Sequence, residues 1–187
     1  LKTQPKSHKI VYINNKENLG IQSNYLNAKS KCNGKYIAMC EGDDYWVDNL
    51  KLQKQVDFLE SNSDYAFCCS NGKSVDEYGT FLGKKLFEQK DKTIKIEDFL
   101  NISNPVATCT VIFKADELTD CNFIKKYSFG DWALWAHILA NKKESKAFYM
   151  NCIFAHYRIH NGGVFNSLGR IDKINSKLKN FQTFANF

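Results

Sequence analysis

A short apolar segment that runs directly into a cluster of acids constrains this chain more than any other feature. Residues 35–46 read KYIAMCEGDDYW, so the apolar run is followed at once by three carboxylates, those of Glu41, Asp43 and Asp44. Such a run is typical of a buried strand in an α/β sheet, and open α/β sheets bind their ligands at the carboxyl ends of their strands. We therefore predict a strand over 35–40 with a ligand site directly after it.

The three acids admit two interpretations. Carboxylates this close repel one another, and they stay ionised together only where water, basic side chains or a cation offsets their charge. A hard divalent cation is one solution, since Mg²⁺ is usually held by one or two carboxylates together with substrate phosphates. The alternative is a solvated acidic turn that leads into a helix with Asp48 as its N-cap. The motif alone does not decide between them.

Length and composition favour one globular domain. The chain has 187 residues, of which 43% are hydrophobic and 25% charged, and a chain of this size can bury a core. We therefore predict a single domain over 1–187. The net charge of +6 favours anionic partners such as nucleotide diphosphates or a phospholipid surface. The basic residues are scattered, so a nucleic-acid partner is not expected.

The cysteines indicate a reducing compartment. Seven cysteines occur without a Cys-x-x-Cys pair, and the sequence shows neither a signal peptide nor an apolar run of about 18 residues. We therefore predict reduced thiols in a cytoplasmic protein, with the inner face of the membrane as an alternative location.

The spacing of apolar residues predicts an alternation of strands and helices. The predicted strands cover 9–13, 35–40, 65–70 and 106–113, and the predicted helices cover 19–33, 48–60, 94–101, 129–139 and 171–187. A right-handed crossover would make the first two strands parallel. The charged residues of the second helix, Lys51 among them, are predicted to form a solvated face. Residues 71–93 lack periodicity and are predicted to form a loop with a short hairpin.

Two further stretches carry candidate functional residues. FGDWALW at 129–135 opens a helix, where an aspartate commonly acts as a cap and stabilises by about 1 kcal/mol, so Asp131 has a structural interpretation beside a catalytic one. AHYRIHNGGV at 155–164 places Arg158 and His160 before a Gly-Gly pair, which permits close backbone approach. A single histidine is more often a hydrogen-bonded structural residue than a ligand, and both interpretations stay open.

Taken together, these stretches resemble the inverting, family 2 glycosyltransferases of the GT-A fold. The resemblance rests on NNKENLGIQSN at 14–24, GKYIA at 34–38, EGDDYW at 41–46, the Gly-Asp-Trp segment at 130–132 and YRIHNGG at 157–163, which occur in the family's order. It implies a GT-A-like α/β fold, in which an open, mixed, Rossmann-like sheet is flanked by helices. The donor and metal half would cover 9–70, the acceptor half 94–164 and a C-terminal helix 170–187. Family members carry one further β-α-β unit before this region, so the resemblance also implies an N-terminally incomplete domain.

The resemblance implies roles for individual residues. In the family, an Asp-x-Asp motif holds a divalent metal on the donor diphosphate, and here Glu41 stands at its first position. The metal, Mn²⁺ or Mg²⁺, would be bound by Asp43 and His160. The general base that deprotonates the acceptor hydroxyl would be Asp131. The other implied site residues contact substrates, with Glu41, Asp44 and Arg158 on the donor and Trp132 and Thr108 facing the acceptor.

The function implied by the resemblance is transfer of a sugar with inversion. The donor would be a nucleotide-sugar, with a UDP-sugar favoured, and the acceptor a hydroxyl of a cell-surface glycan or a lipid-linked acceptor. Two alternatives stay open, a non-catalytic carbohydrate-binding or scaffold domain of the same fold and another Mg²⁺-nucleotide enzyme such as a nucleotidyltransferase. The second alternative lacks the Gly-rich or basic phosphate loop that such enzymes usually carry near the first strand.

The last stretch of the chain also has two interpretations. Residues 171–187 place apolar side chains at helical spacing among lysines. They form either a terminal helix that packs on the domain or a basic amphipathic surface that makes peripheral contact with a membrane bearing a lipid-linked acceptor.

Overall fold

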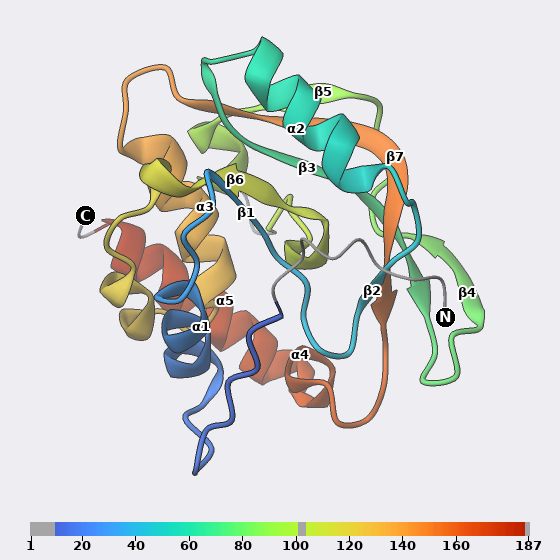
Figure 1. The fold of residues 1–187 in the computed structure, drawn as a ribbon. Coiled ribbons are helices and arrows are strands. Elements are labelled where there is room, and N and C mark those ends of the chain that lie inside the picture. Colours follow the sequence, from blue (N-terminus) through green and yellow to red (C-terminus); the bar gives the residue numbers. More distant parts are fainter. Residues whose placement is uncertain (1–9, 101–103, 186–187) are drawn as a thin grey trace. The chain divides into compact units, whose positions relative to one another are not determined.

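The computed structural model describes residues 10–100 and 104–185 (Figure 1). The chain divides into two compact units, Leu1–Cys32 and Asn33–Phe187, which are described separately below. Within the described residues, no helix is long and apolar enough to cross a membrane.

The first unit contains helix α1, Ile21–Lys29. The side chain of Asn15 bonds to two residues of this helix, since its Nδ2 donates to Asn24 Oδ1 and its Oδ1 accepts from Asn27 Nδ2, both at 2.8 Å. The predicted helix is therefore confirmed, although it ends at Lys29 rather than near residue 33.

The strand predicted over 9–13 is wrong for its described residues, 10–13. No strand forms there, and the side chains of Ile10, Val11 and Tyr12 are more than half exposed. A strand requires a neighbour that accepts and donates its backbone hydrogen bonds, which an apolar pattern alone does not supply. The predicted parallel pairing of this segment with the strand at 35–40 falls with it.

The second unit is built on a mixed sheet with the strand order β1-β6-β3-β7-β2. In that order the strands are Tyr36–Ala38, Ile112–Lys114, Tyr65–Val75, Lys146–Arg158 and Tyr45–Trp46. The long strands β3 and β7 are parallel, and the other neighbours in this order are antiparallel. Two short strands extend the sheet, β4 (Phe81–Lys85) against β3 and β5 (Lys92–Ile94) against β7.

Helices cover both faces of this sheet (Figure 1). They are α2 (Lys51–Ser61) on one side, α3 (Gly130–Ala140) and α5 (Arg170–Ala185) on the other, and the short α4 (Val164–Ser167). Neighbouring residues of β3 point to opposite layers: Phe67 packs against Trp135 of α3 at 5.5 Å between ring centroids, whereas Cys68 packs with Leu59 of α2. The sheet therefore has one core on each face, as an α/β fold requires.

The other predicted strands form, with changed bounds. The segment 35–40 forms β1, and 65–70 forms the first half of β3, which continues into the predicted loop and pairs there with β4 as a hairpin. The strand expected over 106–113 is reduced to β6 because residues Thr108–Thr110 form a 3₁₀ turn. The Thr110 hydroxyl stabilises that turn by donating to the Ala107 carbonyl at 2.7 Å.

The start of α2 differs from the prediction in two ways. Asp48 is not the N-cap, which is Leu50; instead Asp48 Oδ1 accepts a hydrogen bond from the Leu50 amide at 2.6 Å and forms a turn before the helix. Lys51 does not belong to a solvated face, because its side chain is only 1% exposed. The charge of Lys51 is therefore buried between the helix and the sheet.

The two later helix predictions are confirmed in type. The helix predicted over 129–139 is α3, and that over 171–187 is α5, whose last two predicted residues lie outside the described part. The segment 94–101 forms a 3₁₀ helix at Ile96–Leu100 instead of an α-helix.

All seven cysteines are free thiols. Four of them are buried, namely Cys68, Cys69, Cys109 and Cys121, and the other three are exposed.

Candidate active site

The predicted acids lie on a turn between the first and last strands of the sheet order. This acidic turn, residues 41–44, leaves β1 and enters β2, and the Asp44 amide donates to the Glu41 carbonyl at 3.2 Å. Strand β2 pairs with the end of β7, where Tyr45 lies opposite His156. The acidic turn is thereby placed beside residues 156–160, which belong to the third functional stretch.

Arg158 holds the acidic turn in place. Its backbone amide donates to Asp44 Oδ1 at 2.8 Å, and its Nε donates to the Asp43 carbonyl at 2.8 Å. Its guanidinium also donates to the Glu77 carbonyl at 2.6 Å and lies 5.4 Å from the ring centroid of Tyr45. The structure thus brings Arg158 to the predicted donor site, where it contacts backbone carbonyls.

Asp43 and His160 lie in direct contact. His160 Nε2 is 3.0 Å from Asp43 Oδ2, and the two side chains are 25% and 44% exposed. A Cβ atom at Gly162 would come within 3.3 Å of His160 Nδ1, so the glycine leaves room for the imidazole ring. Asp43 and His160, the two residues predicted to bind the metal, therefore present a carboxylate oxygen and a ring nitrogen to the same solvent-accessible position.

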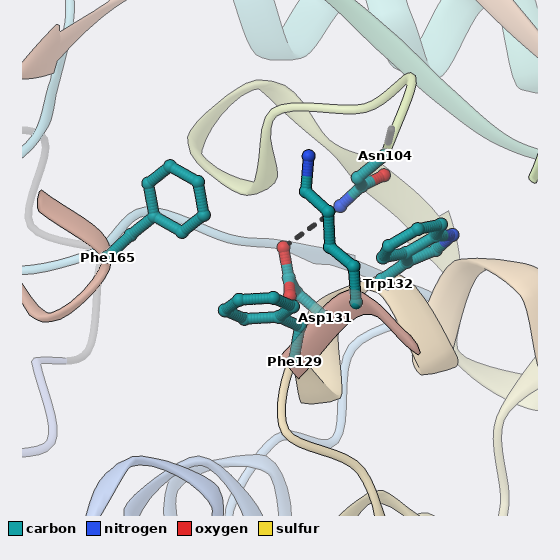
Figure 2. Close-up of a pocket in the computed structure, with 6 residues that line it drawn as sticks. Asn104, Phe129, Asp131, Trp132 and Phe165 are labelled. Carbon is teal, nitrogen blue, oxygen red and sulfur yellow. Dashed lines mark hydrogen bonds between the residues drawn. The ribbon is translucent and has the colours of Figure 1, made fainter. Parts of the chain in front are cut away.

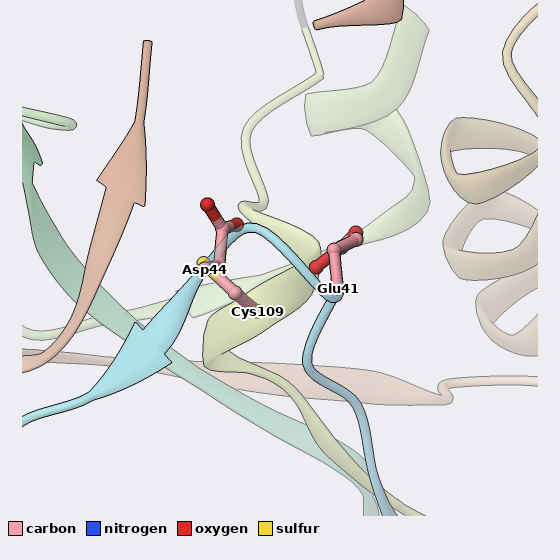
Figure 3. A group of neighbouring side chains, drawn as sticks. All are labelled: Glu41, Asp44 and Cys109. Carbon is pink, nitrogen blue, oxygen red and sulfur yellow. The ribbon is translucent and has the colours of Figure 1, made fainter. Parts of the chain in front are cut away.

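A second group of potential ligands adjoins the acidic turn. Ligand atoms of Glu41, Asp44 and Cys109 lie within 4.8 Å of one another (Figure 3). Burial raises the pKa of the Cys109 thiol, and the negative charges of Asp44 and Glu41 raise it further. A protonated thiol is a poor ligand, and hard cations prefer oxygen. The carboxylates, rather than the sulfur, therefore suit Mn²⁺ or Mg²⁺.

The carboxyl groups of the turn are crowded by like charges. Glu41 is exposed as a residue, yet its carboxyl group is partly buried. This burial, together with the charges of Asp44, Asp131 and Asp43, raises its pKa to about 7. The pKa of Asp44 is raised as well, first by burial, against the opposing hydrogen bond from the Arg158 amide. A cation would relieve this repulsion, so the residues present fit a divalent metal.

Asp131 lies in the first turn of α3 and receives two side-chain hydrogen bonds. Its Oδ2 accepts from Asn104 Nδ2 at 3.0 Å and from the Thr108 hydroxyl at 3.2 Å. Burial raises its pKa, although these donors and the Trp132 amide oppose the shift. The N-cap position belongs to Phe129, which makes no side-chain capping bond. The Asp131 carboxylate is therefore oriented by the segment 104–108 and does not serve as the N-cap.

Asp131 opens onto a small pocket with aromatic walls (Figure 2). The pocket has a volume of about 220 Å³ and is lined by Asn104, Phe129, Asp131, Trp132, Phe165 and Lys177. Of the two residues predicted to face the acceptor, Trp132 lines the pocket, whereas Thr108 contacts it only through its bond to Asp131. The other residues that line the pocket were not predicted from the sequence, namely Asn104, Phe129, Phe165 and Lys177. Among them, only Asn104 carries a signal in the sequence, since it precedes Pro105 and an Asn-Pro pair favours a turn.

Comparisons with known proteins find similar sequences and a similar fold. Residues 1–118 match the family described as Glycosyl transferase family 2. The uncharacterized glycosyltransferase MJ1057 of Methanocaldococcus jannaschii is 28% identical over 96% of this chain and 60% of its own length. The Escherichia coli protein WfaP, named UDP-Glc:alpha-D-GlcNAc-diphosphoundecaprenol beta-1,3-glucosyltransferase, is 30% identical over 85% of this chain and 59% of its own length. The chain thus spans about three fifths of these relatives.

A solved structure shows the fold. The crystal structure of residues 1–349 of S. aureus TarS matches 71% of this chain and 38% of its own, with a TM-score of 0.50 and 16% identity. At this identity the likeness concerns the fold alone. It confirms the predicted GT-A-like α/β fold, a mixed sheet flanked by helices.

Proposed function

Because the chain belongs to glycosyltransferase family 2, we propose that it carries the active site of an inverting glycosyltransferase. The donor is a nucleotide-sugar, with UDP as the nucleotide, and the acceptor is a hydroxyl of a cell-surface glycan or a lipid-linked acceptor. The name of WfaP, which specifies a UDP-linked donor and a lipid-diphosphate acceptor, supports this choice. In this proposal residues 9–70 serve the donor and residues 94–164 the acceptor.

One observation carries the proposal: ionisable residues of all three functional stretches lie close enough to interact with one another. The pKa of Glu41, on the acidic turn, is raised by the charge of Asp131 on α3 as well as by that of Asp43. Asp43 in turn contacts His160, which follows β7. Residues more than 80 positions apart in the chain are thereby brought to a single site, as a reaction with one leaving group and one nucleophile requires.

The donor side consists of the acidic turn and the residues after β7. Asp43 and His160 would hold Mn²⁺ or Mg²⁺, with Glu41, Asp44 and Arg158 around the donor. A divalent cation there supplies positive charge to the diphosphate that leaves. The half-exposed carboxylate of Asp43 is accessible to such a group.

On the acceptor side, Asp131 acts as the base. The acceptor oxygen forms a bond to the anomeric carbon while the bond from that carbon to the diphosphate breaks, and the hydroxyl proton passes to the Asp131 carboxylate. The diphosphate departs with the bonding electron pair. The hydrogen bonds from Asn104 and Thr108 orient the carboxylate, and its raised pKa makes it a stronger base than an ordinary aspartate.

The exposed face of α5 supports a peripheral membrane contact. Ile171, Ile174 and Leu178 are 73%, 49% and 53% exposed, and lysines flank them in the helix. By contrast, Phe181 packs edge-on against Trp132 at 5.2 Å between ring centroids. One face of α5 therefore packs on the domain, and the opposite face presents the apolar and basic side chains that a peripheral membrane contact would use.

The donor site is tested by thermal unfolding with UDP, with Mn²⁺ and with both. A ligand that binds only the folded state stabilises it by about 2.7 kcal/mol at a hundredfold excess over its dissociation constant. We expect an increase in Tm that requires both ligands and that Asp43→Asn abolishes. Asp116→Asn, which removes an exposed acid outside the site, serves as the control and is expected to keep the increase.

Other outcomes would favour other functions. An Asp43→Asn variant that responds like the parent chain would exclude Asp43 from the donor site. Sugar binding that depends on neither nucleotide nor metal would favour a non-catalytic domain, and release of pyrophosphate from a nucleoside triphosphate would favour a nucleotidyltransferase.

A further inference from the structure

A lysine from the C-terminal helix lines the same pocket as the proposed base. Lys177 of α5 is half-buried and lies one turn before Asn180 and Phe181, on the side of the helix that packs against the domain. Lys179, two residues further along, is exposed. The side chain of Lys177 therefore belongs to the packed face of α5, whereas most lysines remain in water.

Asn180 fixes this part of α5 against the start of α3. Its side chain is fully buried, and its Oδ1 accepts from the amides of Ser128 at 2.9 Å and Phe129 at 3.2 Å. Its Nδ2 donates to the Phe129 carbonyl at 3.1 Å. Asp131 follows two residues after Phe129. These three hydrogen bonds therefore fix the turn of α5 that carries Lys177 against the start of α3, which carries Asp131.

The ammonium group of Lys177 has no partner among residues 10–100 and 104–185. In the part of the chain that the structure describes, it makes no ion pair and no hydrogen bond. Asp131 does not pair with it, because the hydrogen bonds to Oδ2 come from Asn104 and Thr108. A half-buried cation without an anionic partner is available to a ligand.

The other residues of the pocket and its volume limit the size and chemical class of that ligand. Phe129, Trp132 and Phe165 form flat apolar walls, as in sites for small organic ligands (Figure 2). The volume of about 220 Å³ is smaller than the roughly 300–1,000 Å³ of drug-sized ligand sites, so it suits a single sugar unit. An anionic group placed beside Asp131 alone would be repelled, and Lys177 offers the opposite charge.

We propose that this pocket binds an acceptor sugar unit that carries an anionic group, a carboxylate or a phosphate, and that Lys177 pairs with that group while Asp131 faces a hydroxyl. The inference rests on the proposed function for the identity of the pocket as the acceptor site. It makes Lys177 a specificity-determining residue, because a neutral sugar would leave the ammonium unpaired.

The test is binding of three monosaccharide probes to the chain without donor or metal, measured by ligand-observed NMR titration. The probes are methyl β-D-glucuronide, glucose 1-phosphate and methyl β-D-glucoside, which carry a carboxylate, a phosphate and no charge. We expect at least one anionic probe to bind about tenfold more tightly than the glucoside, since a hydrogen bond to a charged group is worth this much. Lys177→Gln removes the preference, whereas Lys179→Gln, with the same loss of charge from the same helix, keeps it.

Each other outcome overturns the inference. Equal affinity for the three probes, or no binding of either anionic probe, would show that Lys177 selects no anion. An equal loss in the Lys177→Gln and Lys179→Gln variants would assign the preference to the general positive charge of α5. Because these measurements need neither UDP nor turnover, their failure is distinguishable from a failure of the donor-binding test with UDP and Mn²⁺.

Discussion

The buried ammonium of Lys51 leads to a prediction about stability and pH. Its Nζ donates to Gln55 Oε1 at 2.8 Å and lies 4.5 Å from the ring centroid of Trp46. Among the described residues, no carboxylate forms an ion pair with it. Burial is the main cause that lowers its pKa from 10.5 to about 8. Since one pKa unit corresponds to about 1.4 kcal/mol, the charged form destabilises the folded state by about 3 kcal/mol.

The direction of the pH dependence follows from proton linkage. Below pH 8 the lysine is protonated in both the folded and the unfolded state, so its unfavourable burial is fully present. Between about pH 8 and 10.5 the unfolded chain binds more protons than the folded one, and the free energy of unfolding therefore rises with pH. From pH 7 to pH 10 this gain amounts to about 2.5 kcal/mol.

The assay compares urea unfolding of the parent chain and Lys51→Met at several pH values from 7 to 10. Other groups change stability in the same range; for example, burial raises the pKa of Tyr149, which lowers stability as pH rises. These groups are present in both proteins and cancel in the difference. We expect the parent chain to gain about 2.5 kcal/mol relative to Lys51→Met over this range.

An exposed lysine of the same helix provides the control. Lys54→Met removes a lysine of the same helix whose side chain is 46% exposed, and this variant is expected to follow the pH dependence of the parent chain. If the curves of the parent chain and Lys51→Met run parallel between pH 7 and 10, then Lys51 does not titrate as a buried group, and the account of its burial is wrong.

Three further substitutions test the packing of the fold and the site. Gly72→Ala places a Cβ 2.7 Å from the Ala155 carbonyl oxygen of β7, so we expect a loss of about 1–3 kcal/mol in urea unfolding. Asn180→Ala removes three buried hydrogen bonds and should lower stability by about 2–3 kcal/mol, whereas Asn175→Ala, on the exposed side of the same helix, should change it little. Asp131→Asn should reduce transfer about 10²–10⁴-fold in a sugar-transfer assay, while thermal unfolding at pH 7 shows no loss of stability.

The elements that could be predicted from the sequence are those with a strong local pattern. Helix α3 and strand β1 each lie in a strongly apolar segment next to a glycine, and both are confirmed. The segment 10–13 shows the limit of such patterns, because a strand also depends on a partner elsewhere in the chain. The turn Thr108–Thr110 likewise depends on a distant contact, the hydrogen bond from the Ser70 amide to the Thr110 hydroxyl.

Candidate site residues could be named from the sequence, but their arrangement in space could not. Asp43 stood out because it belongs to a cluster of acids after an apolar run, and Asp131 and His160 stood out because their segments resemble motifs of the family. Asn180 carried no such signal, since an asparagine in a terminal helix is ordinarily exposed, and its burial follows from bonds to residues about 50 positions earlier. Lys51 was misassigned for the same reason, because helical periodicity does not reveal which polar residue the tertiary structure covers.

The pattern of carboxyl pKa shifts separates the candidate site from the rest of the described chain. Every described carboxyl group with a raised pKa belongs to the site, namely Glu41, Asp44 and Asp131. Every one with a lowered pKa lies elsewhere and is bound to a cation or to backbone amides, namely Asp48, Glu60, Asp64 and Asp76.

A carboxyl group whose pKa is raised on folding destabilises the folded state at neutral pH. The folded environment favours its protonated form, whereas the solution at this pH favours its ionised form. Among the described carboxyl groups, the fold therefore tolerates unfavourable ionisation at the candidate site and avoids it elsewhere, as is typical of sites that bind or react. Asp131→Asn separates the two effects, because the amide can still accept the hydrogen bonds from Asn104 and Thr108 but carries no charge. A variant that is as stable as the parent chain and inactive in transfer would show that the buried charge serves the reaction. Reduced stability in that variant would instead show that the charge of Asp131 supports the fold.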